Sequence, residues 1–271
     1  MPPLAAPSAR YHRPPSRPSR RCLTALVAAS ALAACAIPPE RDAATGAAEH
    51  FSPPSRPATG LCRAGEERLD IGSPRPALLY VPHKAATRSA EGPGSPLLLF
   101  FHGATQSPQQ MLDHLRSLAE EHGVIVLAPA SDGITWDAIR GAPGIDAAAT
   151  ERALAATFER CAVDRRHVAI GGFSDGASYA LVLGLPNGDV FTHVLAFSAC
   201  IVAATDTVSA KPRVFLSHGR ADEILPFESC GRRIDRRLRD AGFVVRFETF
   251  AGGHEVPAPV AEAAFRWLLD G

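Results

Sequence analysis

The sequence lacks the features that mark several classes of protein. Its 28 lysine and arginine residues balance 28 aspartate and glutamate residues, so its charge gives no reason to expect a nucleic acid as a partner. It has no Cys-x-x-Cys motif and no cluster of cysteine and histidine at metal-ligand spacing, and we expect neither a metal ion nor an organic cofactor. No segment repeats at a fixed period, which argues against a repeat protein. The sequence makes no prediction of the oligomeric state.

The first 34 residues have the form of an export signal. Five arginines between positions 10 and 21 precede a short apolar stretch, Leu23–Ala34, which at about 12 residues is too short to span a bilayer. The stretch runs into Leu-Ala-Ala-Cys at positions 32–35. This resembles the lipobox of bacterial lipoproteins, in which cleavage precedes the cysteine and its thiol receives a lipid. An ordinary secretory signal with an incidental Cys35 is the alternative.

The residues around this signal predict where the mature protein resides. Ala36, which follows the cysteine, is not acidic, and by resemblance to sorting in Gram-negative bacteria we expect a lipid anchor on the periplasmic side of the outer membrane. The segment Ser19–Thr24 also resembles a twin-arginine motif without its usual Phe and Lys, so the export route stays open between Sec and twin-arginine.

Composition divides the rest of the chain into a tether and one folded domain. Residues 35–60 carry the expected lipidated cysteine and then a stretch rich in Pro, Ala, Gly and Ser without apolar periodicity, which predicts a flexible tether. Residues 61–271 are long enough for one domain with a substantial core and too short for two typical domains.

Four cysteines remain within this domain: Cys62, Cys161, Cys200 and Cys230. An even number of cysteines in an exported chain predicts disulfides, for which three pairings are possible. Because Cys200 follows one predicted strand and Cys230 follows the next, we favour a Cys200–Cys230 bond, which leaves Cys62 to pair with Cys161.

Apolar runs with strand character alternate with helix-like segments along the domain. We expect strands over 77–81, 97–101, 124–127, 168–171, 193–197, 213–217 and 243–250, and helices over 107–122, 147–161, 177–185, 229–241 and 257–269. This alternation predicts an α/β fold with a mostly parallel sheet and helices on both faces. No insertion is long enough for a large lid domain. In such sheets, functional sites form at the carboxyl ends of the strands.

The residues around Ser174 have the sequence form of a nucleophile elbow. Gly-Phe-Ser-Asp-Gly at positions 172–176 follows an apolar strand and precedes a helix-like segment. The serine of such a turn needs glycines two residues away on either side, because the turn is too tight for side chains there. The helix that follows points N–H groups toward developing negative charge. A plain glycine turn between a strand and a helix is the alternative.

Two further loops supply an acid and a base for Ser174. Asp222 follows the strand over 213–217 and is placed to orient a histidine, with Glu223 as the alternative acid. His254 stands after two glycines at the end of the last strand, where it can accept the serine proton and return it to the leaving group.

The loop after the strand over 97–101 predicts an oxyanion hole. Phe-His-Gly-Ala at positions 101–104 nominates the backbone N–H groups of Ala104 and Asp175 as the two donors. His102 then shapes this loop and is not the base. Trp136 follows another strand and is either a wall of the substrate site or an ordinary packing residue.

On these residues the domain resembles the α/β-hydrolase superfamily over essentially its whole length, and within it the phospholipase/carboxylesterase group of serine esterases. The resemblance rests on His-Gly at 102–103, Gly-x-Ser-x-Gly at 172–176, His-Gly-x-x-Asp-x-x-Leu-Pro at 218–226 and Gly-His at 253–254. The stretch Cys161–Asp164 is also similar to polyhydroxybutyrate depolymerase and feruloyl esterase domains. Asp175 stands where many members of the group carry Gln, and Ala177 stands in place of a third glycine.

The resemblance implies a Ser-Asp-His order of the triad and a serine hydrolase that cleaves carboxylic esters through an acyl-enzyme. Its substrate would be a small-molecule or polymeric ester. A polyester depolymerase or a feruloyl-type esterase is the alternative within the same chemistry. An acyltransferase and a non-catalytic binding domain on the same fold are the alternatives from other classes.

Overall fold

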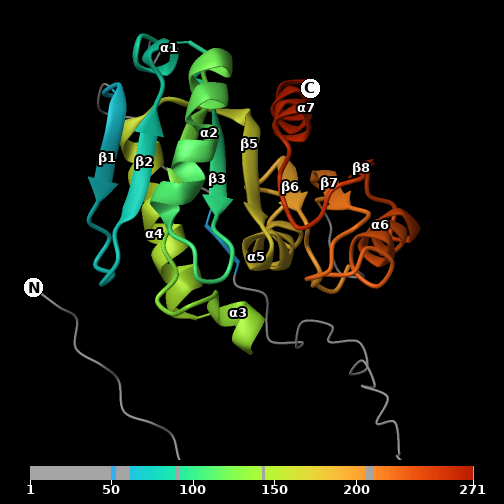
Figure 1. Cartoon of the computed structure of the whole chain (residues 1–271). Coiled ribbons are helices and arrows are strands. Elements are labelled where there is room, and N and C mark those ends of the chain that lie inside the picture. The colour runs from blue at the N-terminus through green and yellow to red at the C-terminus, as the bar shows by residue number, and fades with distance from the viewer. Residues whose placement is uncertain (1–49, 53–61, 89–91, 142–143, 206–209, 271) are drawn as a thin grey trace, which may run out of the picture. The chain divides into compact units, whose positions relative to one another are not determined.

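A computed structural model of the chain describes residues 50–52, 62–88, 92–141, 144–205 and 210–270 (Figure 1). The expected signal peptide, Cys35 and most of the expected tether lie outside the described residues. Among the described helices, none has both the length and the apolar character needed to cross a membrane.

The described domain is built on one eight-stranded sheet with the order β1-β2-β4-β3-β5-β6-β7-β8 (Figure 1). Neighbouring strands from β4 through β8 pair in parallel, whereas β1 and β2 pair antiparallel at one edge. The strands span β1 Gly65–Leu69, β2 Ala77–Val81, β3 Ser95–Phe101, β4 Ile125–Ala128, β5 Val163–Phe173, β6 His193–Phe197, β7 Arg213–Gly219 and β8 Val245–Phe250.

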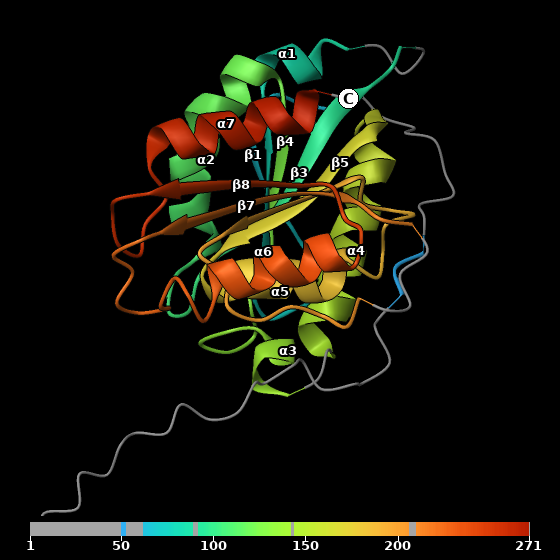
Figure 2. The same cartoon turned by 90° about the vertical axis from the view of Figure 1, so that its right-hand side faces the viewer.

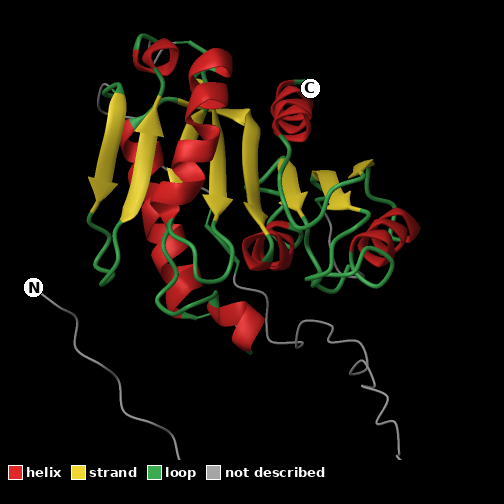
Figure 3. Ribbon diagram, in the orientation of Figure 1, coloured by secondary structure: helices red, strands yellow, loops and turns green. Residues whose placement is uncertain are grey.

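Helices cover both faces of this sheet, as Figures 2 and 3 show. In Figure 2, α7 lies above β7 and β8 and α5 and α6 lie below them; the core layers place α2 on the face of α7 and α4 on the face of α5 and α6. The helices span α1 His83–Ala86, α2 Pro108–His122, α3 Asp137–Arg140, α4 Ile145–Arg160, α5 Asp175–Gly184, α6 Gly231–Asp240 and α7 Ala258–Leu269. The α/β fold with a mostly parallel sheet and helices on both faces, predicted from the sequence, is therefore confirmed.

Alternating side chains of the central strand divide the core into two layers. Leu97, Leu99 and Phe101 of β3 pack in one layer with α4, α5 and α6, while Leu98 and Phe100 pack in the other with α2 and α7. This is the period of two that a strand buried on both faces requires. Burial on both faces also explains why β3 consists almost entirely of apolar residues.

One strand was not predicted from the sequence, and strand β5 departs most from its predicted bounds. Strand β1 reads Gly-Glu-Glu-Arg-Leu, and its three charged residues are exposed at the edge of the sheet, so no apolar run marks it. Strand β5 begins at Val163, five residues before the expected start, because its first half carries charged residues that the apolar criterion excludes.

Both expected disulfides are present, Cys62–Cys161 and Cys200–Cys230. The first joins the segment before β1 to the end of α4. The second joins the loop after β6 to the residue before α6.

Part of the segment expected as a tether lies against the domain. Phe51 is buried and packs edge-on against Phe191, with ring centroids 5.9 Å apart. Its backbone N–H donates to Oδ1 of Asn187 at 2.7 Å. A tether prediction based on composition misses this contact because a single buried aromatic residue has no periodicity.

Candidate active site

Ser174 lies on a strained turn at the carboxyl end of β5, directly before α5. Its φ of 58° and ψ of −120° fall in a region that non-glycine residues rarely adopt. A Cβ on Gly172 would lie 2.4 Å from backbone atoms of Gly176, and one on Gly176 would lie 2.4 Å from the carbonyl oxygen of Phe101. The two glycines of the motif are therefore required by close backbone contacts, as the elbow pattern predicts.

His254 and Asp222 join Ser174 in one chain of hydrogen bonds. Nε2 of His254 lies 2.8 Å from Oγ of Ser174, and Nδ1 of His254 lies 2.7 Å from Oδ2 of Asp222. A carboxylate accepts only, so Nδ1 carries the proton that it receives and the Nε2 lone pair faces the serine hydroxyl. The loops after β5, β7 and β8 thus bring together three residues that lie 32 and 48 positions apart in sequence.

The environment of Asp222 favours its charged form. Burial raises the pKa of this carboxyl group, but hydrogen bonds from the Leu225 amide and from His254 outweigh burial, so the pKa lies below its usual value. The backbone N–H groups of Ile224 and Leu225 donate to Oδ1 at 2.9 and 2.8 Å. Asp222 therefore contacts His254 as an anion, and the alternative acid, Glu223, is exposed.

A second histidine approaches the same carboxylate. His218 is buried, and its Nε2 lies 2.7 Å from the carbonyl oxygen of Leu225 and 3.3 Å from Oδ2 of Asp222. Burial lowers the pKa of this imidazole, so it donates as a neutral ring. The sequence places His218 in the motif of the loop but does not reveal this contact.

The loop after β3 leaves one amide free where an oxyanion donor is expected. The N–H of Gly103 donates to Oε1 of Gln106 at 2.9 Å, and that of Thr105 donates to the carbonyl oxygen of Ile134 at 2.7 Å. Within the described part of the chain, the N–H of Ala104 between them has no acceptor. Asp175 is the first residue of α5, where N–H groups have no partner within the helix.

His102 holds this loop from inside the domain. Its Nδ1–H donates to the carbonyl oxygen of Gly103 at 2.8 Å, and its Nε2 accepts from the Ser131 amide at 3.2 Å. Burial lowers its pKa, which fits a neutral ring that donates on one side and accepts on the other. The structure thus gives His102 the loop-shaping contacts expected from the sequence.

Trp136 does not line the site, and its prediction as a substrate wall is wrong. The side chain is fully buried, stacks on Tyr179 and donates from Nε1 to the carbonyl oxygen of His102 at 2.8 Å. The apolar ring gains more from this core position than from the surface. The hydroxyl of the neighbouring Thr135 instead donates to Oδ2 of Asp175, the residue after Ser174, at 2.6 Å.

The described residues contain one group with the side-chain types of a metal site, and it lies on other elements. Glu121 and His122 of α2 face Glu262 of α7. Glu262 already accepts from His122 at 3.0 Å and from Arg266 at 2.7 Å. This group takes no part in the chain of hydrogen bonds at Ser174.

The chain is similar to known esterases over the region that carries these residues. The Phospholipase/Carboxylesterase family matches residues 145–265, a stretch that includes Ser174, Asp222 and His254. The bifunctional acetylxylan esterase/xylanase XynS20E of Neocallimastix patriciarum is 28% identical over 169 residues, which is 59% of this chain and 23% of that protein. The chain thus spans about a quarter of the length of that relative.

Solved structures of hydrolases share the fold. Fluorophosphonate-binding serine hydrolase F of Staphylococcus aureus superposes with a TM-score of 0.60 at 14% identity, covering 78% of this chain and 100% of that one. A carboxylesterase of Mesorhizobium loti gives a TM-score of 0.56 at 19% identity, covering 76% of this chain and 100% of that one. Esterase PE8 gives a TM-score of 0.54 at 19% identity, with 77% and 99% covered.

Proposed function

We propose that this chain, whose residues 145–265 match the Phospholipase/Carboxylesterase family, is a member of the α/β-hydrolase superfamily and hydrolyses carboxylic esters through Ser174. The observation that supports this most directly is the continuous path of hydrogen bonds from Oγ of Ser174 through His254 to the buried carboxylate of Asp222. Each member stands at the carboxyl end of a strand, where sites form in sheets of this kind.

In the proposed reaction, Oγ of Ser174 attacks the ester carbon while Nε2 of His254 takes the hydroxyl proton. The carbonyl oxygen becomes an oxyanion, which the N–H groups of Ala104 and Asp175 stabilise. The carbon–oxygen bond to the alcohol then breaks, and His254 returns the proton to the leaving alkoxide. Asp222 stabilises the charged imidazole throughout. A water molecule, activated by the same histidine, attacks the acyl-enzyme and releases the acid.

The similarity to an acetylxylan esterase suggests esters of short acyl groups as the first substrates to test. XynS20E is described as an acetylxylan esterase, and we propose that this chain also acts on small acyl esters. The test is hydrolysis of p-nitrophenyl esters of graded acyl length beside a feruloyl ester and a polyester film. A clear preference for the feruloyl ester or the film would instead identify the feruloyl-type or depolymerase alternative.

Replacement of the nucleophile tests the mechanism. Ser174→Ala should lower kcat/KM for p-nitrophenyl acetate by at least about 10³-fold, because no other group can form the acyl-enzyme. The exposed Ser52→Ala provides the matched control and should retain full activity. Circular dichroism and the melting temperature should match between the two variants. Undiminished turnover by a folded Ser174→Ala protein would overturn the assignment.

We also propose that the protein is exported and anchored to the periplasmic side of the outer membrane through a lipid on Cys35. Two disulfides in the folded domain support an oxidising compartment. Metabolic labelling with radioactive palmitate should mark the intact protein and leave Cys35→Ala unlabelled. Equal labelling of both would contradict the anchor.

A further inference from the structure

A cavity of about 320 Å³ lies beside the proposed oxyanion loop. Its wall includes Gln106, whose side chain accepts the N–H of Gly103 and which follows Ala104 by two residues. Residues of β1, of β2 and of the segments after β3 and β4 complete the wall. Since β3, β4 and β5 run parallel, the lining segments that follow β3 and β4 lie at the same end of the sheet as Ser174.

Two arginines give this cavity an excess of positive charge. Nη1 of Arg75 donates to the carbonyl oxygens of Ser131 and Gly133 at 3.2 and 3.5 Å, which are neutral acceptors. Arg68 forms no ion pair within the described part of the chain. The only carboxylate among the lining residues is Glu66, and it already pairs with Arg116.

Arg75 also connects the cavity to the reacting centre. The segment that it holds, residues 131–133, continues into Ile134, whose carbonyl oxygen accepts the N–H of Thr105. The next residue, Thr135, donates to the side chain of Asp175, directly after the nucleophile. The positive charge of Arg75 reaches His102 as well, since it contributes to the lowered pKa of that ring. One continuous loop therefore joins the arginine wall to Thr105, the neighbour of Ala104, and to the side chain of Asp175.

We propose that this cavity binds a carboxylate carried by the ester substrate, so that the enzyme prefers anionic esters over neutral ones of the same size. Arginine guanidinium groups bind carboxylates in bidentate geometry, and they are weakly hydrated compared with an ammonium group. A volume of about 320 Å³ is at the lower end of the range for small-ligand pockets. This proposal rests on the proposed esterase function.

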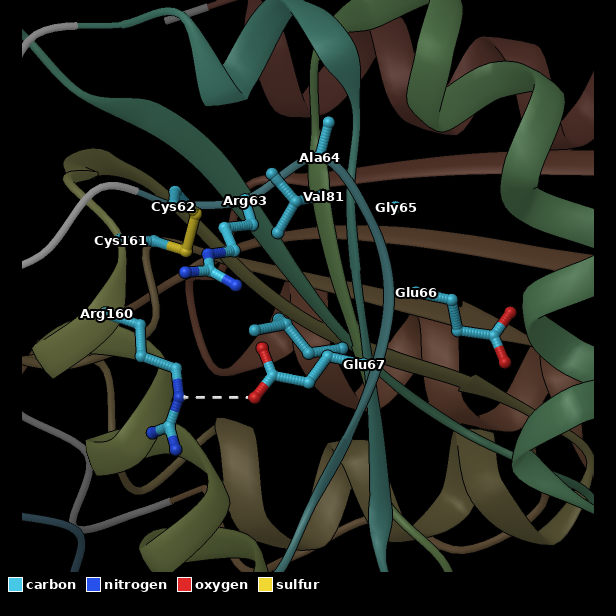
Figure 4. Close-up of a pocket in the computed structure, with 10 residues that line it drawn as sticks. Cys62, Arg63, Ala64, Gly65, Glu66, Glu67, Val81, Arg160 and Cys161 are labelled. Carbon is cyan, nitrogen blue, oxygen red and sulfur yellow. Dashed lines mark ion pairs between the residues drawn. A yellow bond between two sulfur atoms is a disulfide. The ribbon is translucent and has the colours of Figure 1, made fainter.

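A second cavity in the described domain offers a matched control. It has a volume of about 460 Å³ and lies beside the Cys62–Cys161 disulfide, where Glu67 pairs with Arg160 at 3.7 Å (Figure 4). Arg63 lines this cavity and is exposed like Arg68. It lies outside the wall of the proposed subsite.

The test compares esters that differ in one charge. The first pair is 4-acetoxybenzoate and its methyl ester, with the charge on the alcohol side. The second is mono-p-nitrophenyl glutarate and p-nitrophenyl pentanoate, with the charge on the acyl side. At low salt, wild-type kcat/KM should favour the anionic member of at least one pair by about tenfold or more, and added salt should reduce this preference.

The arginine variants should remove the preference without removing catalysis. In Arg68→Gln the preference should fall several-fold, while the neutral esters keep their rates within about twofold. In the double variant with Arg75→Gln the ratio of the anionic to the neutral rate should fall to about one, whatever the rate on the neutral esters. Arg63→Gln should behave as wild type. Arg75 holds a loop through bonds to two carbonyl oxygens, whereas Arg68 makes no such contact. If Arg75→Gln does not fold, Arg68→Gln alone therefore still tests the proposal.

The outcomes separate this proposal from the proposed function. If neutral esters turn over in a Ser174-dependent way but the Arg68 and double variants keep the wild-type preference, the subsite is wrong and the esterase stands. If no ester turns over, the esterase assignment fails. Calorimetry of glutarate binding to Ser174→Ala protein, with and without Arg68→Gln, then tests the subsite independently of turnover. Weaker binding in the Arg68→Gln protein supports the subsite. Equal binding in both, or no binding to either, contradicts it.

Discussion

At the scale of single residues, the carboxylate of Asp222 accepts hydrogen bonds from His254 and from two backbone amides, and Nε2 of the buried His218 lies 3.3 Å from its Oδ2. Both amide donors belong to the loop that carries Asp222, and His218 donates to the carbonyl oxygen of Leu225 in the same loop. A fixed acceptor holds the imidazole in the orientation that presents Nε2 to Ser174. Asp222 is therefore oriented by the loop that carries it, and His218 acts on the reaction through Asp222.

This arrangement predicts that His218 is a positioning residue. His218→Leu removes the Nε2 donor and should lower kcat by about tenfold or more, with little change in KM, because the triad loses alignment while the substrate still binds. His218→Gln carries an amide N–H near the position of Nε2 and should restore part of the loss. The measurement is steady-state hydrolysis of p-nitrophenyl acetate by folded variants. Equal defects in both substitutions would indicate a packing role instead.

The sequence predicted the three residues that hydrogen-bond to one another at the site, but not the contacts of the residues around them. Ser174, Asp222 and His254 were predicted because each stands in a short motif after a strand. The burial of Trp136 and the bond from Thr135 to Asp175 were not predicted, because they depend on how the segment after β4 folds back over α5. No pattern of spacing encodes that path.

At the scale of elements, the turn from β5 into α5 brings the start of α5 so close to the end of β3 that no side chain fits between their backbones. Gly176 lies so close to the end of β3 that a Cβ there would lie 2.4 Å from one carbonyl oxygen and 2.5 Å from the next, those of Phe101 and His102. The contact holds the start of α5 against the strand that leads into the oxyanion loop. Nucleophile and oxyanion donors are thus held together by backbone packing.

We therefore predict that Gly176→Ala lowers the free energy of unfolding by about 2–4 kcal/mol, because the backbone of β3 must shift to admit the methyl group. Gly141→Ala is the matched control, since the φ of Gly141, 172°, lies outside the left-handed region and no described atom lies within 4 Å of its Cβ position. It should change stability by less than about 1 kcal/mol. Urea denaturation of both variants measures the difference. A fully stable Gly176→Ala protein would refute the close contact.

The strands and helices themselves were largely predictable from the sequence. Central strands are buried on both faces and so read as apolar runs, as in β3 and β6. Helix α2 begins at Pro108, one residue after the predicted start, because Ser107 is its N-cap and forms a capping box with Gln110. The edge strand β1 and the first half of β5 escaped prediction because their charged side chains reach solvent.

At the scale of the whole molecule, three histidines buried in the domain are held neutral: His102, His193 and His218. Burial is the main cause of the lowered pKa of each. For His193, burial and the nearby Arg213 and His167 lower the pKa to about 4. The unfolded chain binds protons on these rings at a higher pH than the folded protein, so acid should destabilise the fold.

The pH range over which the fold should lose stability follows from the pKa of His193. Its contribution to stability is complete above about pH 6.5 and is lost as the pH falls toward about 4, because in that range only the unfolded state takes up the proton. Between pH 7 and pH 5 the loss amounts to about 2 kcal/mol. Urea unfolding of His193→Phe should therefore show a pH dependence smaller by about this amount.

The exposed His114→Gln serves as the control for this measurement and should keep the wild-type dependence on pH. A decrease in stability between pH 7 and pH 5 that is the same in His193→Phe and in wild type would contradict a neutral, buried His193.

The central claim is that Ser174 is a nucleophile activated by His254 and Asp222. Reaction of the folded protein with a fluorophosphonate, followed by mass spectrometry of the intact chain and of its peptides, tests it most directly. We predict a single adduct on Ser174, absent from Ser174→Ala and formed much more slowly by His254→Ala. An unlabelled wild-type protein, or an adduct on another residue, would contradict the account.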